Sequence, residues 1–410
     1  MTTIRETLDG LRGGGRGWTL LFVAAGWLFI SGFRIVLPAL LPQIKSDFAV
    51  DNASAGFALT VLWMTYAALQ FPAGVVADRT GERNLLIGGA LLGAVSFGLF
   101  YLVPVFALFL VVCGVFGVGA GLFGTPRDMF LSRTFPESDN TAYGVTFAAG
   151  SLGAATLPYV GTLVAGRWGW RLAVGWLLPL LLLVGVGLWW ATPVPSSSGS
   201  SVSSESSVSA DYPISERLPP GRTVRLTLRT LTDRWVLLAS TAMILFVFTY
   251  QALLSFLPTY LVEVKNIDQG LSALLFGLLF VAGTVVQPVA GHAADRIGER
   301  TVVLTLIGVA TVTVLALPFA EGVVWLSVLV PLVGVRIAIG PLTSAFIVRE
   351  LPVSIRGTGW GFLRTVFFGI GATGSSVVGV FADAGLFDAA FVFLAGLTGA
   401  TAAFWLAITG

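Results

Sequence analysis

Twelve long apolar stretches divide this 410-residue chain, and each is long enough to cross the hydrocarbon layer of a membrane as a helix. Of the residues, 56% are hydrophobic and 11% are charged, whereas soluble domains carry about a quarter charged residues. A soluble protein of this composition would lack the polar groups to cover its surface. We therefore predict an all-α polytopic membrane protein with 12 transmembrane helices. The expected spans are residues 18–41, 54–77, 84–103, 105–126, 141–165, 171–192, 235–258, 271–292, 301–319, 323–347, 357–381 and 386–408.

Two other kinds of membrane-associated sequence are excluded. Three arginines precede residues 18–41, but this stretch is longer than the apolar region of a cleaved signal peptide, so we expect a retained helix. Residues 176–190, WLLPLLLLVGVGLWW, do not alternate as the strands of a transmembrane β-barrel would. With one cysteine, Cys113, and one histidine, His292, we expect no intramolecular disulfide and no metal site, and we expect no cofactor.

Basic residues indicate the orientation, because loops rich in Lys and Arg stay in the cytoplasm. If the N-terminus is cytoplasmic, the cytoplasmic segments hold 16 of the 23 basic residues and the outer loops hold four. We therefore expect a multi-pass protein of the cell membrane, surrounded by the lipid bilayer, whose termini and central loop are cytoplasmic. The formal net charge of +2 is small and spread through the loops, so we expect no nucleic-acid partner.

One polar segment separates six expected spans from six. Residues 196–209, SSSGSSVSSESSVS, are too polar to bury and are typical of a flexible linker. The basic stretch 222–235 that follows is either an amphipathic helix on the inner membrane surface or a solvated tether. We therefore divide the chain into a six-helix unit at 1–192, a cytoplasmic Ser-rich linker with a basic amphipathic end at 193–234, and a second six-helix unit at 235–410.

The two halves repeat each other at an offset of 217 residues. The sequence GVVADRTGER at Gly74–Arg83 matches GHAADRIGER at Gly291–Arg300, and seven of the ten positions are identical. The same offset carries Gly144 onto Gly361, where the fifth and eleventh expected spans begin. Parallel repeats of six helices give two pseudo-symmetric bundles.

The loop pattern G-x-x-x-D-R-x-G-x-[RK], present once in each half, resembles the signature of the major facilitator superfamily. This resemblance covers nearly the whole chain. It implies two six-helix bundles around a central cavity that opens alternately to either side, with helices 1, 4, 7 and 10 around the cavity and helix 11 able to contribute. The chain departs from the family pattern in two respects. Glu82 and Glu299 replace a commonly basic residue, and the fifth span keeps only part of the drug-antiporter motif, at 158–161.

The chemistry of the repeated loop suggests a gate. Asp78 and Asp295 lie at the inner ends of helices, where a carboxylate can pair with arginines and complement a positive helix N-terminus. Such contacts hold one conformation and must break for the other. The alternative is a solvated loop whose charges only enforce the topology. The candidate gating residues are Gly74, Asp78, Arg79, Gly81, Arg83, Asp128, Gly291, Asp295, Arg296, Gly298 and Arg300.

Three arginines occupy positions inside expected spans: Arg34, Arg336 and Arg364. Ionisable residues within a span are costly and by default mark function. The alternative is that each guanidinium snorkels to the interface or binds helix carbonyls. No Asp or Glu lies at a comparable depth, and two arginines from opposite halves around one cavity would bind a carboxylate or phosphate. The candidate substrate-binding residues are Arg34, Arg336, Arg364, Tyr66, Gln70, Tyr250, Gln251 and Trp360.

The resemblance and these arginines together predict a secondary active transporter that moves a small organic anion. We do not expect the protein to be an enzyme. The alternative is a proton-coupled multidrug or other efflux carrier, which the partial drug-antiporter motif favours. The chain has no phosphate-binding loop for ATP, so transport energy has to come from a gradient. A proton and a counter-anion both remain as the coupling ion. We expect a monomer.

We predict that a cysteine placed at Ser200, in protein whose Cys113 has been replaced, stays unlabelled by a membrane-impermeant thiol reagent added to intact cells. The physical reason is the asymmetry of basic residues, which places the 193–234 loop in the cytoplasm. Labelling after permeabilisation is the control for access. Ready labelling of intact cells would overturn the orientation.

Overall fold

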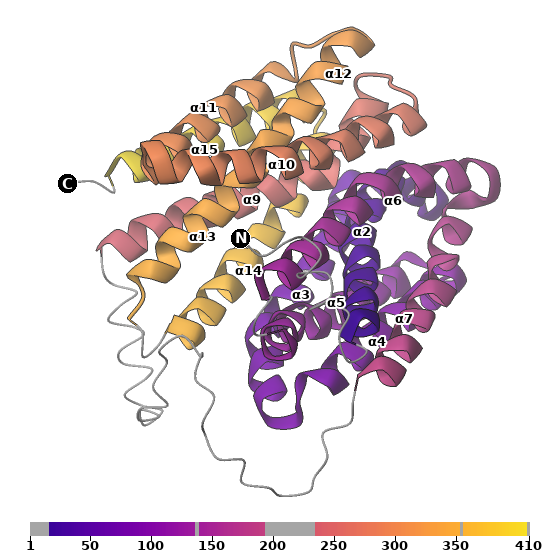
Figure 1. Ribbon diagram of the computed structural model, residues 1–410. Helices are drawn as coiled ribbons and strands as arrows, with labels where there is room; N and C mark the ends of the chain where they lie inside the picture. The colour runs from indigo at the N-terminus through magenta and orange to yellow at the C-terminus, as the bar shows by residue number, and fades with distance from the viewer. Residues whose placement is uncertain (1–15, 136–138, 193–233, 353–355, 408–410) are drawn as a thin grey trace, which may run out of the picture.

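The computed structural model describes residues 16–135, 139–192, 234–352 and 356–407, and all regular structure within them is helical. The termini and nearly all of the expected linker at 193–234 lie outside this part. The helices form two groups, one from each half of the chain (Figure 1). They are α2 (Arg16–Phe48), α3 (Asn52–Thr80), α4 (Glu82–Leu102), α5 (Phe106–Thr134), α6 (Asp139–Gly175), α7 (Leu177–Ala191), α9 (Arg234–Glu263), α10 (Gln269–Ile297), α11 (Glu299–Ala316), α12 (Gly322–Val333), the 3₁₀ segment η2 (Gly334–Ala338), α13 (Ile339–Glu350), α14 (Arg356–Asp383) and α15 (Phe387–Ala407).

Eleven stretches of the described residues are long and apolar enough to span a membrane, so the chain is a multi-pass membrane protein. The expected spans at 141–165 and 171–192 merge into a single apolar stretch of 51 residues, Thr141–Ala191. A straight helix of that length would extend about 75 Å, far more than the roughly 30 Å of hydrocarbon. The chain instead breaks at Gly169, whose φ of 82° is not helical. The count of twelve stays a prediction.

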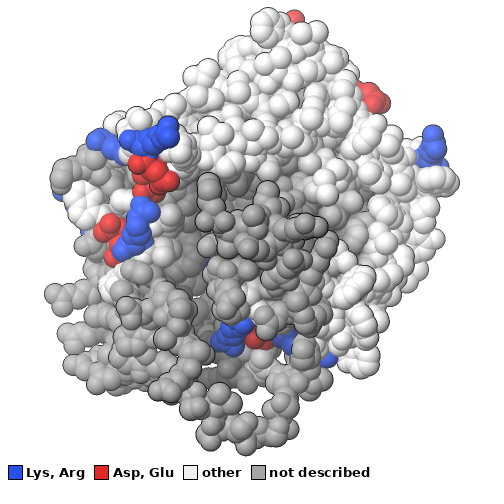
Figure 2. All heavy atoms as spheres, in the orientation of Figure 1, with Lys and Arg blue, Asp and Glu red and all other residues white. Residues whose placement is uncertain are grey.

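Large apolar side chains cover the outer surface. Val324 is 78% exposed, Phe319 74% and Trp190 67%, as expected for residues that face lipid. Figure 2 shows a broad area without charged groups over the helices at the top of Figure 1, and most of the Lys, Arg, Asp and Glu in this view lie in clusters outside it. The composition argument is therefore confirmed: the chain needs an apolar solvent around much of its surface.

The core of the first half is built around aromatic rings. Phe33 on α2 lies 4.5 Å from Phe97 on α4 and 4.6 Å from Phe116 on α5, measured between ring centroids. All three rings are completely buried, and both pairs have the edge-to-face arrangement that aromatic rings prefer. These contacts join three helices of the first half.

The two ends of the helix bundle differ in how the halves meet. We call the end that carries the turns at Gly81 and Gly298 the motif face, and the end that carries the loops at 49–51 and 264–268 the opposite face. The side-chain hydrogen bonds between the described parts of the two halves lie toward the opposite face.

Three of these contacts join α2 to the second half, and two of them involve side chains from both halves. Lys45 Nζ lies 2.8 Å from Glu263 Oε1 at the end of α9. Gln43 Nε2 donates to Gln269 Oε1, at the start of α10, at 2.9 Å. Because both contacts lie near helix ends on the opposite face, they join the halves there, and the described residues at the motif face make no such contact between the halves.

The N-terminus of α3 is capped from both halves. Asp51 accepts a hydrogen bond from the backbone of Ser54, and hydrogen bonds from the Ser54 side chain and backbone lower the pKa of the Asp51 carboxyl. Asp383, at the end of α14, accepts from the backbone N–H groups of Asn52 (2.8 Å) and Ala53 (2.7 Å). These amides lie at a helix start and have no partner within the helix, so the second half supplies their acceptor.

We predict that Asp383→Ala lowers the thermal unfolding temperature of the purified protein, because α3 loses two capping hydrogen bonds. Loss of a cap costs about 0.5–2 kcal/mol. Glu321→Ala is the matched control, since Glu321 occupies the N-cap position of α12 but makes no side-chain capping hydrogen bond. Equal unfolding temperatures for the two variants would show that the cross-half cap contributes nothing.

Candidate functional site: a central cavity between the halves

A cavity of about 480 Å³ lies between the two halves. Its wall comes from α2, α3, α5 and α6 of the first half and from α9, α10, η2, α13 and α14 of the second. The residues of α3 that line the cavity are Trp63 and Tyr66. They lie nearer the motif face than Thr60, whose hydroxyl donates to the backbone carbonyl of Ala372 in the second half. The cavity therefore lies on the motif-face side of the contacts that join the halves.

Arg34 on α2 faces this cavity from inside an aromatic cage. Its guanidinium carbon lies 5.0 Å from the ring of Trp27, 5.1 Å from that of Trp63 and 4.7 Å from that of Tyr66. Each ring attracts the cation through its negative face. The side chain is 7% exposed, and it has no carboxylate partner in the described part of the chain. Arg34 is thus held as a nearly buried positive charge at the cavity wall.

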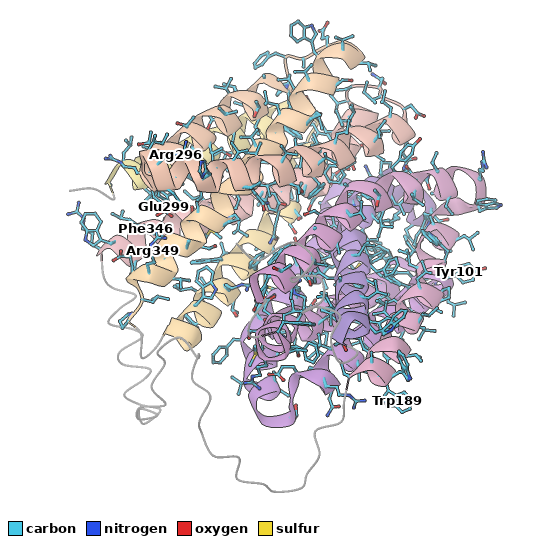
Figure 3. All side chains as sticks on the ribbon, viewed as in Figure 1. Tyr101, Trp189, Arg296, Glu299, Phe346 and Arg349 are labelled. Carbon is cyan, nitrogen blue, oxygen red and sulfur yellow. The ribbon has the colours of Figure 1, made fainter. Side chains whose placement is uncertain are left out.

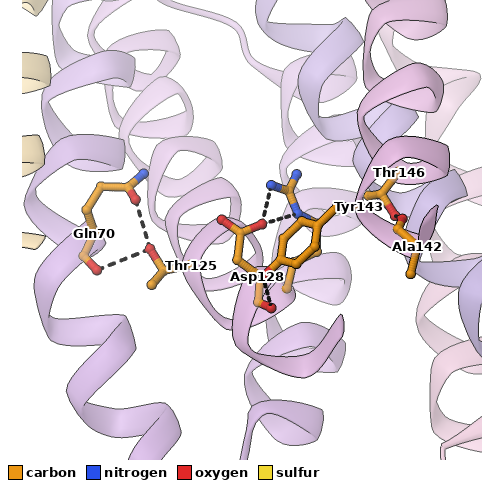
Figure 4. Close-up of polar contacts among 7 residues, drawn as sticks. Gln70, Thr125, Asp128, Ala142, Tyr143 and Thr146 are labelled. Atoms are coloured by element: carbon orange, nitrogen blue, oxygen red, sulfur yellow. Dashed lines mark hydrogen bonds and ion pairs between the residues drawn. The ribbon is translucent and has the colours of Figure 1, made fainter. Parts of the chain in front are cut away.

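A second arginine, Arg127 on α5, faces the cavity beside a carboxylate. Its Nη2 lies 2.6 Å and its Nε 3.0 Å from Asp128 Oδ1, and its guanidinium carbon lies 3.7 Å from the Trp27 ring. The Tyr143 hydroxyl donates to the backbone carbonyl of Asp128 at 2.5 Å (Figure 4). Arg127 Nη1 is buried without a partner. This guanidinium therefore keeps one nitrogen without a hydrogen-bond partner among the described residues.

The second half contributes Arg364 on α14. Its guanidinium carbon lies 5.9 Å from the ring of Phe368, and that ring meets Tyr66 edge to face at 5.9 Å. The Tyr66 ring also contacts Arg34 of the first half. Tyr66 therefore lies between an arginine of the first half and a ring that contacts an arginine of the second half.

Five of the eight predicted substrate-binding residues line the cavity: Arg34, Arg364, Tyr66, Tyr250 and Trp360. Arg336, Gln70 and Gln251 are buried but do not line it. Gln70 Oε1 instead accepts from Thr125 Oγ1 at 2.8 Å (Figure 4), and both amide atoms of Gln251 are buried without a partner.

Arg336 lies behind the cavity wall. The 3₁₀ segment η2 carries it, and its Nη2 donates to Thr249 Oγ1 at 2.6 Å. Its guanidinium carbon lies 5.7 Å from the Phe246 ring and 5.8 Å from the Tyr250 ring, and both rings line the cavity. These contacts hold the buried guanidinium against α9, so the two-arginine clamp of Arg34 and Arg336 is not formed here.

The repeated loops make the same contacts in each half. Gly81 and Gly298 have φ values of 83° and 89°, a backbone conformation that favours glycine and allows a tight turn in each loop. The glutamate that follows each glycine pairs with an arginine near the end of a helix in its own half. Glu82 Oε1 lies 2.5 Å from Arg133 Nη1 on α5. Glu299 pairs with Arg349 on α13, as Figure 3 shows.

The last arginine of each motif binds the end of its half's final helix. Arg83 Nη2 donates to the Trp189 carbonyl on α7 at 2.7 Å, and Arg300 Nη2 donates to the Leu406 carbonyl on α15 at 3.1 Å. The acceptors are themselves 217 residues apart, as are the arginines. A cation at a helix C-terminus complements the helix dipole, so each arginine stabilises the end of the last helix in its own half.

Comparisons with known proteins agree with this architecture. The family model of the Major Facilitator Superfamily matches residues 22–373. This chain belongs to the Major Facilitator Superfamily. Among solved structures, a point mutant of the nucleoside transporter NupG superimposes with a TM-score of 0.79 at 14% identity, covering 96% of this chain and 100% of that chain.

Curated relatives of this superfamily member are distant and differ in substrate. Multidrug resistance protein Stp of Mycobacterium tuberculosis is 30% identical over 37% of this chain and 29% of its own length. The probable sulfoacetate transporter SauU of Cupriavidus necator is 25% identical over 65% of this chain, and a hexuronate transporter of Bacillus subtilis is 23% identical over 67%. The chain spans 62% of SauU and 64% of the hexuronate transporter, less than two thirds of either.

The structure describes the side chains of only some of the remaining gating candidates of this superfamily member. The side chains of Asp78 and Arg79 lie outside the described residues. Asp295 and Arg296 are exposed at the motif face, and Gly74 and Gly291 lie in the helices that lead into the loops. Asp128 pairs with Arg127 and lines the cavity. A gating role for these residues stays a prediction.

Sequence reasoning missed Arg127, Trp27 and Trp63. The expected fourth span ends at residue 126 and leaves Arg127 in a loop, whereas α5 continues to Thr134 and carries Arg127 along the cavity. Trp27 precedes Arg34 by seven residues, or two helical turns, and Trp63 precedes Tyr66 by three. This spacing places each tryptophan on the same helix face as a predicted residue and is a usable signal.

We predict that Arg83→Ala increases amide hydrogen exchange at the end of α7, because Arg83 donates three hydrogen bonds to Trp189 and Thr192. Arg300→Ala is the matched variant in the other half, where one described hydrogen bond to Leu406 is lost, and it should loosen α15 less. Unchanged exchange at residues 188–192 in Arg83→Ala would contradict the structural role of the motif arginine.

Proposed function

We propose that this superfamily member is a secondary active transporter that moves a small organic anion across the cell membrane. The observation that carries the proposal is the charge of the cavity wall. Arg34, Arg127 and Arg364 line it, and Asp128 is the one carboxylate among its described lining residues. The wall thus has a surplus of two positive charges, and guanidinium groups match carboxylate, sulfonate and phosphate oxygens.

In this proposal the anion binds among Arg34, Arg364, Tyr66, Tyr250 and Trp360, all of which line the cavity. The buried residues Arg336, Gln70 and Gln251 support the wall from behind in the present conformation. Two of the relatives are named for anionic substrates, sulfoacetate and hexuronate, which supports the substrate class.

Alternating access follows from the uneven contacts between the halves. We propose that the motif face, the termini and the linker are cytoplasmic, so that the cavity communicates with the cytoplasm in this conformation. Opening to the other side then requires Lys45 to leave Glu263 and Asp383 to leave α3. The repeated loops, with Asp78 and Asp295, would close the motif face in that state. We propose that a monomer carries out this cycle.

A proton and a counter-anion are both compatible with this site as the coupling ion. Asp128 is the carboxylate of the described cavity wall, and it neutralises Arg127 while charged, so a coupling proton would bind there. A counter-anion would instead use the same arginines as the substrate.

The second candidate is a proton-coupled multidrug efflux carrier. Aromatic residues make up much of the wall, including Trp27, Trp63 and Trp360, and Stp is a multidrug resistance protein. Lipophilic cations stack on such rings. A thermal-shift screen of the purified protein separates the two functions, because selective binding stabilises the folded state. We expect glucuronate or sulfoacetate to raise the unfolding temperature and tetraphenylphosphonium to leave it unchanged. Stabilisation by the cation alone would establish the multidrug function instead.

We predict that Arg34→Gln weakens binding of the stabilising anion by about 1.5–3 kcal/mol, the scale of a hydrogen bond to a charged group, measured by isothermal titration calorimetry. Arg34→Lys should restore only part of the affinity, because lysine lacks the planar two-point contact. Arg167→Gln, which removes an exposed arginine near the opposite face, is the control and should bind normally. Wild-type affinity in a well-folded Arg34→Gln protein would remove Arg34 from the site.

A further inference from the structure

Trp27 is the only described aromatic residue whose ring lies against two cavity arginines. Its ring lies 5.0 Å from the guanidinium carbon of Arg34 and 3.7 Å from that of Arg127. Because both distances end on the same indole, the two guanidinium carbons lie within about 9 Å of each other. Trp63 and Tyr66 contact Arg34 alone, and Phe147 contacts Arg127 alone.

The orientation of this indole is fixed by α6. A Cβ atom at Gly150 would lie 2.5 Å from Trp27 Cδ1 and closer still to Nε1, so a larger residue does not fit there without movement of the indole. Trp27 is 8% exposed. Because position 150 is glycine, the edge of the indole lies directly against the α6 backbone, and the ring has little freedom to turn.

Two like charges this close repel each other, and the repulsion grows as water is excluded. Asp128 compensates Arg127, but Arg34 has no carboxylate partner among the described residues. Long arginine side chains would move apart if nothing held them. The indole opposes this movement because its electron-rich ring attracts both cations.

We propose that Trp27 is a positioning residue that holds Arg34 and Arg127 as a pair, and that this pair selects short dianions over monoanions of the same shape. The proposal rests on the proposed function and specifies its substrate class. One acidic group of the ligand binds Arg34. The second reaches the buried N–H of Arg127 that has no partner, Nη1. A dianion also matches the surplus of two positive charges in the cavity wall.

The probes are succinate and its monoamide, succinamate, which have nearly the same shape and differ by one charge. Dissociation constants are measured by isothermal titration calorimetry on the full-length protein. We expect the wild type to bind succinate at least about tenfold more tightly than succinamate, since one additional charged contact is worth that factor or more. Trp27→Leu should remove most of this preference by weakening succinate binding, while succinamate binding changes little. Trp27→Phe, which keeps a smaller ring, should retain part of it.

Trp63→Leu is the matched control, because Trp63 contacts Arg34 but not Arg127. It should weaken both probes by a similar factor and leave their ratio unchanged, which separates pairing of the arginines from general damage to the cavity. Gly150→Ala tests independently whether the contact of the indole with α6 matters. It should reduce the ratio of the succinamate to succinate dissociation constants as Trp27→Leu does. Unfolding temperatures show whether each variant is folded.

The preference for succinate over succinamate decides the proposal. A preference that falls in Trp27→Leu and Gly150→Ala but not in Trp63→Leu supports it. A wild-type protein that binds other anions but shows no preference for succinate overturns it, as does a ratio that is the same in folded Trp27→Leu protein. Failure of the wild type to bind any anion overturns the proposed function as well.

Discussion

Backbone hydrogen bonding in an apolar solvent constrains everything else in this protein. Hydrocarbon offers no partner to an exposed N–H or C=O group, so the described spans are built almost entirely of α-helix. The two departures lie at Gly169, near the opposite face, and at η2, where the 3₁₀ turns carry Arg336 into the interior of the second half. A short 3₁₀ segment within a helix often marks a functional hinge, and here it adjoins the cavity wall.

Helix ends account for most of the charged contacts, and they do so in two distinct ways. At the motif face, Arg83 and Arg300 bind the last helix of their own halves, so the repeated loops hold each bundle together. At the opposite face, Asp383 caps α3 across the junction of the halves. The described caps therefore stabilise each half internally at the motif face and join the halves at the opposite face.

The cavity concentrates positive charge where the bundles meet. Arg34 and Arg127 are kept there by the ring of Trp27, and Asp128 offsets only part of their charge. Aromatic rings suit this task because they attract cations without adding a negative charge that would compete with an anionic ligand. Arg336, one of the largest completely buried side chains, is also held by rings and a hydroxyl, so the same solution recurs behind the wall.

Composition, the apolar stretches and the repeated loop determined the helical membrane fold and the superfamily, because those properties depend on the solvent that each stretch requires and on local turn chemistry. The positions of Arg34 and Arg336 inside long apolar stretches were likewise readable from the sequence. Only the tertiary structure decided which arginines share the cavity. Arg127 entered it because α5 runs beyond the expected span, and Arg336 was excluded because Phe246 and Tyr250 cover it. Spacing along a helix fixes the face on which a side chain lies, but the packing of the neighbouring helices fixes whether that face meets a cavity, a ring or lipid.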